Sequence, residues 1–226
     1  MRTLSLAVAG IALVVWPSLV CAEVSPALVQ KVVAARQKNA TMLRQYTWES
    51  RTEITENAAV KDIRLEQNTF GPDGQPQRTL INDQAAPLPS GFLRKKIAEK
   101  ERDKMETYLK GLHALLDQYT LPTAGKTLDF VLQAQVTPAN ASGNLQFFRG
   151  SVAVPGDSMS LWIGAVDLQP KRMQVTTFYQ GDQINMTITY KTLSNGFTYP
   201  EFGQVEVFGK GITLQVHNFN YANQNN

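Results

Sequence analysis

Gly156-Asp157-Ser158, within the stretch VPGDSMSLWI, has the strongest claim to chemistry in this sequence. A serine after Gly-Asp can act as a nucleophile, but at neutral pH it needs a neighbouring base. The Asp-x-x-His spacing that GDS-type esterases use is missing, because Leu214 stands three residues before His217. The other interpretation is a hairpin corner, since Pro155-Gly156-Asp157 is typical turn chemistry. We expect the corner and predict no catalytic residue.

Two further patterns contain part of a functional motif, one for phosphate binding and one for metal binding, but lack required residues. Ala124-Gly125-Lys126-Thr127 resembles the end of a phosphate-binding loop, but that pattern requires a glycine where Thr120 stands. The sequence predicts a helix start there instead. His113 and His217 are more than a hundred residues apart, and no cysteine follows Cys21, so metal-ligand spacing is lacking. We expect no metal, no cofactor and no enzyme activity.

The first 22 residues have the pattern of a secretory signal peptide. Arg2 precedes an apolar run from Leu4 to Trp16, and Val20-Cys21-Ala22 fits a cleavage site. The bulk of Val20 disfavours lipidation of Cys21, so we expect cleavage after Ala22 and no lipoprotein. The mature chain, residues 23–226, then has no cysteine and must fold as one domain around an ordinary hydrophobic core. The bacterial periplasm suits such a chain.

The charge of the chain argues against a nucleic-acid partner. The formal net charge is +3 over 226 residues, too small a field for nucleic-acid binding. A basic run from Arg94 to Lys104 is interleaved with Glu99, Glu101 and Asp103. Such interleaving indicates a solvated helix face. Peripheral contact of this run with anionic lipid headgroups or an envelope protein is the alternative.

Hydrophobic periodicity divides the mature chain into helices and strands. Apolar residues three and four apart predict a helix that starts after the N-cap Ser25 and runs to about Tyr46. A period of two then predicts two strands around a turn at Asn57-Ala58. Further on, the sequence predicts one edge strand near 78–81, a long helix over 92–119 that Pro122 ends, a short helix over about 127–135, and strands from 145 to 221.

The strands after residue 145 alternate between apolar and polar side chains. Met159, Leu161 and Ile163 share one face, for example, while Ser160 belongs to the other. A sheet with one dry and one wet face, connected by short hairpins, is antiparallel. Its dry face needs a cover, which the helices supply. The sequence therefore predicts an α+β fold.

The dry face is rich in methionine, because Met159, Met173 and Met186 fall on inward positions of three successive strands. Methionine is flexible, so these residues suit either a core or a wall that adapts to an acyl chain. Both interpretations stay open. If the dry face is the wall of an acyl-chain site, the residues at inward-facing strand positions line that site. They are Trp48, Ile54, Met159, Leu161, Met173, Val175, Met186 and Ile188.

Three stretches resemble the periplasmic lipoprotein-carrier (Lol-type, outer-membrane lipoprotein-sorting) superfamily. They are YTWESRTEI after the first helix, MSLWIGAVDLQPKRMQVTT, and YKTLSNGFTYPEFGQVEV. The resemblance implies a curved antiparallel β-sheet, an unclosed barrel, covered by the N-terminal helix and a central helical insertion at about 92–135. It also implies a concave face that takes up acyl chains by binding and without catalysis. The arginine with which such carriers hold their lid has no counterpart at Arg51, because that residue alternates outward.

The predicted function is an exported periplasmic binding protein for lipid or lipoprotein acyl chains, acting as a monomer on a lipid or an acylated protein. The first alternative is an envelope interaction or assembly module whose apolar face is simply core. An apolar cavity of roughly 300 Å³ or more between sheet and helices favours binding, and a filled interior favours the module. The third candidate, a serine hydrolase, needs a His or Lys side chain within hydrogen-bond reach of Ser158.

Overall fold

The computed structural model describes residues 25–71, 76–84, 92–120, 123–138 and 143–224. The side chains of residues 92–95, 97 and 98 are outside this description. So is the predicted signal peptide, residues 1–22. Among the described residues, no helix combines the length and the apolar character needed to cross a membrane.

Three α-helices and ten strands make up the described fold. The helices are α1 (Pro26–Leu43), α2 (Phe92–Leu116), which continues into the 3-10 turn η1 (Asp117–Tyr119), and α3 (Ala124–Gln133). The strands are β1 (Tyr46–Glu56), β2 (Ala59–Phe70), β3 (Pro76–Asp83), β4 (Gln135–Pro138), β5 (Asn144–Gly150), β6 (Ser158–Gly164), β7 (Pro170–Tyr179), β8 (Asp182–Thr192), β9 (Thr198–Val207) and β10 (Ile212–Asn223). A second 3-10 turn, η2 (Phe208–Lys210), joins β9 to β10.

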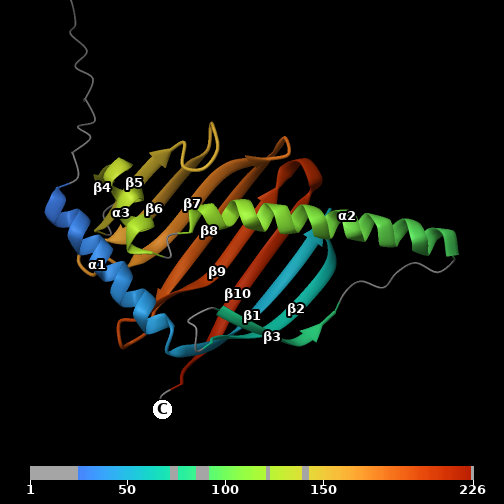
Figure 1. Ribbon diagram of the computed structural model, residues 1–226, viewed down its shortest axis with the longest axis horizontal. Coiled ribbons are helices and arrows are strands. Elements are labelled where there is room, and N and C mark those ends of the chain that lie inside the picture. Colours follow the sequence, from blue (N-terminus) through green and yellow to red (C-terminus); the bar gives the residue numbers. More distant parts are fainter. Residues whose placement is uncertain (1–24, 72–75, 85–91, 121–122, 139–142, 225–226) are drawn as a thin grey trace, which may run out of the picture.

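All ten strands belong to one antiparallel sheet, in the order β3-β2-β1-β10-β9-β8-β7-β6-β5-β4. The sheet is strongly curved and open, with β3 and β4 at its two edges (Figure 1). The helices all lie on the concave side. α1 and α3 cover the end formed by β4 to β7, and α2 crosses the sheet diagonally and continues past its edge (Figure 1). The predicted fold class is confirmed.

Local sequence signals explain where the elements begin. The Ser25 hydroxyl accepts a hydrogen bond from the Leu28 amide at 3.3 Å, and Pro26 occupies the first turn of α1. The Thr123 hydroxyl accepts from the Lys126 amide at 3.2 Å and caps α3, which confirms the predicted helix start at the AGKT motif. Asn57 and Ala58 both have positive φ, the requirement of a tight two-residue hairpin turn between β1 and β2.

The elements differ from the sequence prediction in one region. The short helix begins at Ala124 and ends at Gln133, and the following residues form β4, a strand that the sequence did not predict. β4 forms because Val136 pairs with Phe147 across a long-range antiparallel ladder, which local periodicity does not reveal. The predicted end of the long helix at Pro122 lies outside the described residues, and α2 gives way to η1 at Asp117.

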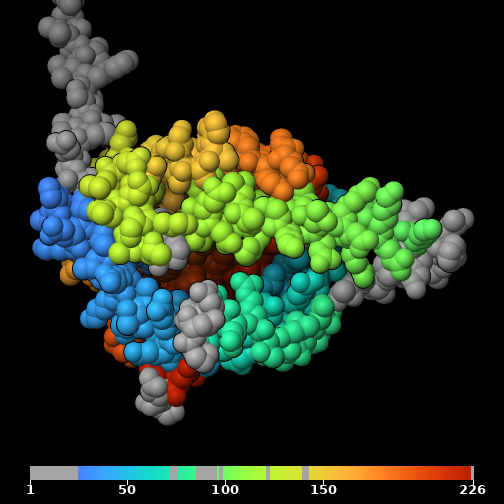
Figure 2. Space-filling view, in the orientation of Figure 1, coloured from blue at the N-terminus to red at the C-terminus, as the bar shows by residue number. Residues whose placement is uncertain are grey.

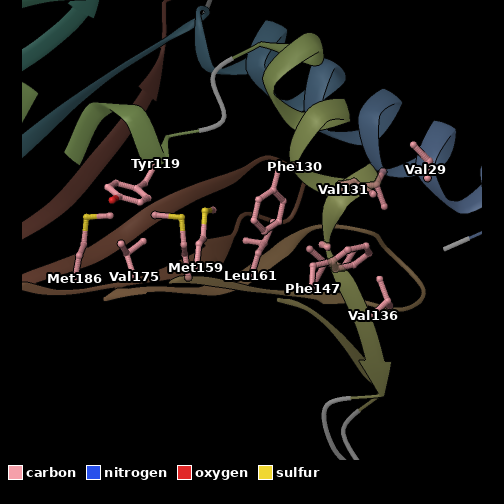
Figure 3. Close-up of a cluster of buried hydrophobic side chains, with 14 of the residues drawn as sticks. Val29, Tyr119, Phe130, Val131, Val136, Phe147, Met159, Leu161, Val175 and Met186 are labelled. Atoms are coloured by element: carbon pink, nitrogen blue, oxygen red, sulfur yellow. The ribbon is translucent and has the colours of Figure 1, made fainter. Parts of the chain in front are cut away.

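The main core lies between the sheet and the helices α1 and α3. Val29 of α1 and Phe130 of α3 pack against Phe147, Met159 and Leu161 of the sheet, and all five are at most 3% exposed (Figure 3). Tyr119 of η1 is fully buried in the same cluster. This end of the concave face is therefore filled.

Candidate functional site

The Gly156-Asp157-Ser158 motif is a structural corner. Asp157 is 3% exposed, and its carboxylate accepts hydrogen bonds from the amides of Val152, Ala153 and Val154 at 2.6–2.7 Å. It also accepts one from the Tyr119 hydroxyl at 2.7 Å. Burial raises the pKa of Asp157, but these four donors outweigh that effect and hold the pKa below its usual value.

Ser158 lies at the start of β6 on the sheet face away from the helices. Within the described part of the chain, no histidine or lysine side chain hydrogen-bonds to Ser158. His113 of α2 instead pairs with Asp117 of η1 at 3.2 Å, and His217 lies against the Phe202 ring, with 4.5 Å between ring centroids. Ser158 thus lacks the base that the hydrolase alternative requires. The described residues also contain no group of three His, Cys, Asp or Glu side chains that could hold a metal ion.

The concave face is best described by rows of side chains that run across the strands. In one such row each residue is paired with the next on the neighbouring strand, so all its members face the helices. The row comprises Val136, Phe147, Leu161, Met173, Ile188, Gly203, Val216, Thr52 and Arg64, from β4 to β2. A parallel row comprises Met159, Val175, Met186, Val205, Leu214, Ile54 and Asp62.

Both rows become more accessible in the same direction. In the first row, Leu161 and Met173 are buried, whereas Ile188, Gly203 and Val216 are half-buried. Figure 2 shows the reason: the surface is hollowed between α2 on one side and α1 and β3 on the other, and β9 and β10 form the floor of the hollow. We call this hollow the groove.

Gly203 marks the middle of the groove floor. It lies within β9 opposite Ile188 and Val216, where the alternation calls for an apolar side chain. A Cβ atom added to Gly203 would contact one described atom within 4 Å, Cγ1 of Ile188 at 3.9 Å. The space immediately above Gly203 is therefore almost free of described atoms. Glycine inside a strand is typical of places where another group approaches the backbone closely.

One wall of the groove is charged. Arg64 and Asp62 follow Thr52 and Ile54 in the two rows, and Asp83 of β3 is paired with Arg64. Arg64 Nε lies 2.8 Å from Asp62 Oδ2. Burial and a hydrogen bond with Asp83 raise the pKa of Asp62, and Arg64 opposes that shift. The floor is apolar and the β2–β3 wall is polar, so the groove is amphipathic.

Aromatic rings close the end of the groove beneath the last turn of α1. Tyr46 stacks on Phe197 with centroids 4.5 Å apart, and Tyr221 contacts both Tyr199 at 4.0 Å and Trp48 at 5.6 Å. Burial raises the pKa of Tyr221, so its hydroxyl stays neutral. The Asn39 side chain of α1 fixes the helix to this end, because it donates to the Thr198 carbonyl at 2.6 Å and accepts from the Thr198 amide at 2.8 Å.

The structure divides the predicted lining into two groups. Met159, Leu161, Met173, Val175 and Met186 belong to the filled core beneath α1, α3 and Tyr119 (Figure 3). Ile188 lies on the groove floor, Ile54 lies where α2 meets the groove, and Trp48 belongs to the aromatic end. The predicted lining left out Gly203, Val205 and Val216, although alternation puts both valines on the apolar face of the sheet. The available signal was Gly203, a glycine that interrupts an alternating strand.

Two depressions of the described surface lie away from the floor formed by β9 and β10. One, of about 340 Å³, lies beside α2 and is lined by residues such as Lys100, Asp103 and Gln180. The other, of about 270 Å³, lies on the opposite face of the sheet, among Ser160, Gln174 and neighbouring polar residues. The apolar floor around Gly203 belongs to the groove, which is the candidate site for an apolar ligand.

Comparison with known proteins gives likenesses in structure. No protein-family model matches the chain, and no curated protein matches it. A LolA superfamily protein from Nitrosomonas europaea has a TM-score of 0.40 at 10% identity, over 85% of this chain and 92% of its own. A protein domain from Vibrio parahaemolyticus named for outer membrane lipoprotein sorting has a TM-score of 0.42 at 8% identity, over 87% and 93%. A DUF1329 family protein from Desulfovibrio piger has a TM-score of 0.43 at 9% identity, over 86% and 92%.

Proposed function

We propose that this protein binds the acyl chain of a lipid or an acylated protein in the groove, as a monomer in the periplasm and without catalysis. The observation that carries the proposal is the open floor around Gly203, with half-buried Ile188 and Val216 on either side. Half-buried apolar side chains at the bottom of a hollow gain about 25 cal/mol for each Å² of apolar surface that a ligand removes from water. An acyl chain has the length and the flexibility to follow such a floor.

The charged wall favours an amphiphilic ligand over a purely apolar one. Asp62 and Arg64 stand at the edge of the apolar rows, on the strand next to Thr52 and Ile54. A ligand that lays its chain along the floor can therefore place a polar head against β2. At the aromatic end, the half-buried rings of Trp48 and Tyr221 supply rigid apolar surface for the far end of the acyl chain.

The test is displacement of a fluorescent fatty acid from the delipidated protein. Gly203→Leu fills the space above the floor, so we expect probe affinity to fall about tenfold or more, since a partly blocked groove loses several buried methylene groups. Thr213→Leu is the matched control, because it places the same side chain on the opposite face of the neighbouring strand. We expect the control to bind the probe like the parent protein.

Two results would contradict the proposal. Equal probe affinity of the Gly203→Leu and Thr213→Leu variants would mean that the probe binds elsewhere. Absence of probe binding, together with no lipid in native mass spectra after mild extraction, would favour the assembly module with a packed core.

A further inference from the structure

The sheet carries a second concavity on the face away from the helices. It has a volume of about 270 Å³ and is lined by side chains from β6, β7, β8 and β9. We call it the outer-face pocket. Its polar lining includes Ser158, Ser160, Gln174, Thr176, Asn185 and Thr187. This volume is just below the ~300–1,000 Å³ typical of ligand sites, so the pocket suits a group of about one ring.

The pocket offers hydrogen-bonding groups that the protein itself leaves unused. Among the described residues, the side chains of Ser158, Gln174 and Thr187 make no hydrogen bond. The Asn185 Oδ1 accepts from the Thr176 hydroxyl at 3.2 Å, which leaves the Asn185 amide nitrogen as a donor. All of these residues are half-buried, so their groups face a partly desolvated space. Two side-chain amides and several hydroxyls are thus available to one ligand.

The lining carries little charge. Glu206 is its one charged side chain among the described residues, and it accepts a hydrogen bond from Gln204 at 3.0 Å. Arg172, which precedes Gln174 in the outward row of β7, lies over the Trp162 ring at 5.6 Å from its centroid. A phosphate would meet the Glu206 carboxylate and no cation among the described lining residues, and one carboxylate alone is a poor match for a multivalent cation, so the pocket favours an uncharged ligand rich in hydroxyl and amide groups.

Aromatic rings flank the pocket along the strands. Phe178 follows Thr176 in the outward row of β7 and is 44% exposed. Trp162 follows Ser160 in the outward row of β6. Residues two apart on a strand are about 7 Å apart, so both rings border the polar lining. An exposed ring beside neutral donors and acceptors matches a sugar, which has C–H faces for the ring and hydroxyls for the polar groups.

We propose that the outer-face pocket binds an uncharged acetamido sugar. The acetamide of such a sugar presents one N–H and one carbonyl oxygen. The side-chain amides of Gln174 and Asn185 present the complementary acceptor and donors. The ring hydroxyls bond to Ser158 and Thr187, and Phe178 covers a C–H face of the sugar. This site is independent of the acyl-binding groove, because it lies on the other face of the sheet.

The experiment is an NMR titration of the purified ¹⁵N-labelled protein with the N-acetylglucosamine trimer, and with maltotriose as a sugar of equal length without acetamides. We expect the acetamido trimer to shift backbone amides of β6 to β9 around the pocket, with maltotriose at least about fivefold weaker. The Gln174→Ala, Asn185→Ala double variant removes both amides, so we expect roughly tenfold weaker binding. The Gln67→Ala, Gln77→Ala variant is the control, because it removes two amides from the same face on β2 and β3, outside the pocket.

Several outcomes would overturn the inference. They are no shifts with the acetamido trimer, shifts that map onto the groove, equal binding of maltotriose, or an equal loss in the control variant. The Gly203→Leu variant separates this site from the proposed function, because it blocks the groove and leaves the outer-face pocket unchanged. Acetamido-sugar binding that persists in Gly203→Leu supports the outer-face pocket even if no acyl chain binds the groove.

Discussion

At the scale of single residues, Asp157 and not Ser158 gives the GDS motif its importance. The Asp157 carboxylate receives three backbone amides and the Tyr119 hydroxyl, whereas Ser158 faces the outside of the sheet. Asp157→Ala leaves these buried donors unpaired, so we expect a loss of about 3–5 kcal/mol in the free energy of unfolding. We expect Ser158→Ala to change it by less than about 0.5 kcal/mol. Urea unfolding followed by circular dichroism measures both, and similar losses in the two variants would contradict this account.

The same carboxylate makes stability depend on acid pH. Its hydrogen bonds hold the folded-state pKa of Asp157 below the unfolded value, which is about 3.9. Between those two pKa values the unfolded chain binds more protons, so the contribution of Asp157 is complete above about pH 4 and is lost as the pH falls through the folded pKa. We expect urea midpoints to fall less steeply between pH 5 and pH 2 in Asp157→Asn, whose side chain does not titrate. A parallel fall in both proteins would assign the acid sensitivity to other carboxylates.

Alternation in the sequence predicted well which face of the sheet a side chain lies on, and predicted poorly how exposed that side chain is. Alternation placed Met159 and Ile188 correctly on the helix side of the sheet, and Arg51 on the other. It could not predict that Met159 is fully buried while Ile188 is half-buried, because α1 and α3 supply the cover from more than twenty residues away in the chain. A period of two reports the face of a residue and carries no information on what packs against that face.

At the scale of elements, the two halves of α2 differ in how much they pack against the sheet. Its second half presents Tyr108, Leu112 and Leu115 to the sheet, each less than 9% exposed. In its first half, the side chains of residues 99–104 are all exposed, and the helix continues past the edge of the sheet (Figure 1). Few buried apolar contacts imply a low local free energy of opening. We therefore expect amide hydrogens of 96–104 to exchange much faster than those of 108–116.

A substitution tests whether packing of α2 holds the groove wall. Leu112 is 2% exposed against Ile184, Val207 and Ile212, so Leu112→Ala should cost about 2–5 kcal/mol and should speed exchange along the second half of α2. Lys110→Ala, on the exposed side of the same helix, is the control and should change neither quantity. Unaltered exchange in Leu112→Ala would show that α2 is held by other contacts, such as the Tyr108 hydroxyl bond to Asp182 at 3.1 Å.

At the scale of the whole molecule, the helices cover one end of the curved sheet more fully than its middle. The covered end forms the core, and the less covered middle forms the groove. α1 and α3 contact each other over β4 to β7, and the hydrophobic cluster there is closed. α2 packs over the middle strands β8 to β10 on one side of the groove (Figures 1 and 2). The curved antiparallel sheet and its helical cover were predictable from alternation and resemblance. The position of the opening was not, because it depends on the crossing path of α2.

If the groove binds a ligand, filling it should raise the stability of the free protein and lower its affinity for that ligand. Substitution of Gly203 tests both effects. Gly203→Leu removes the entropic disadvantage of glycine in a strand, about 0.5–1 kcal/mol, and covers apolar floor that Ile188 and Val216 now expose to water. We expect its Tm without ligand to equal or exceed that of the parent by a few degrees. A fatty acid at about 100 times its Kd should stabilise the parent by about 2.7 kcal/mol, and this increment should disappear in Gly203→Leu. A variant that is both more stable and unresponsive would show that glycine at this position serves the ligand and not the fold. A variant that keeps the full increment would place the acyl chain outside the groove.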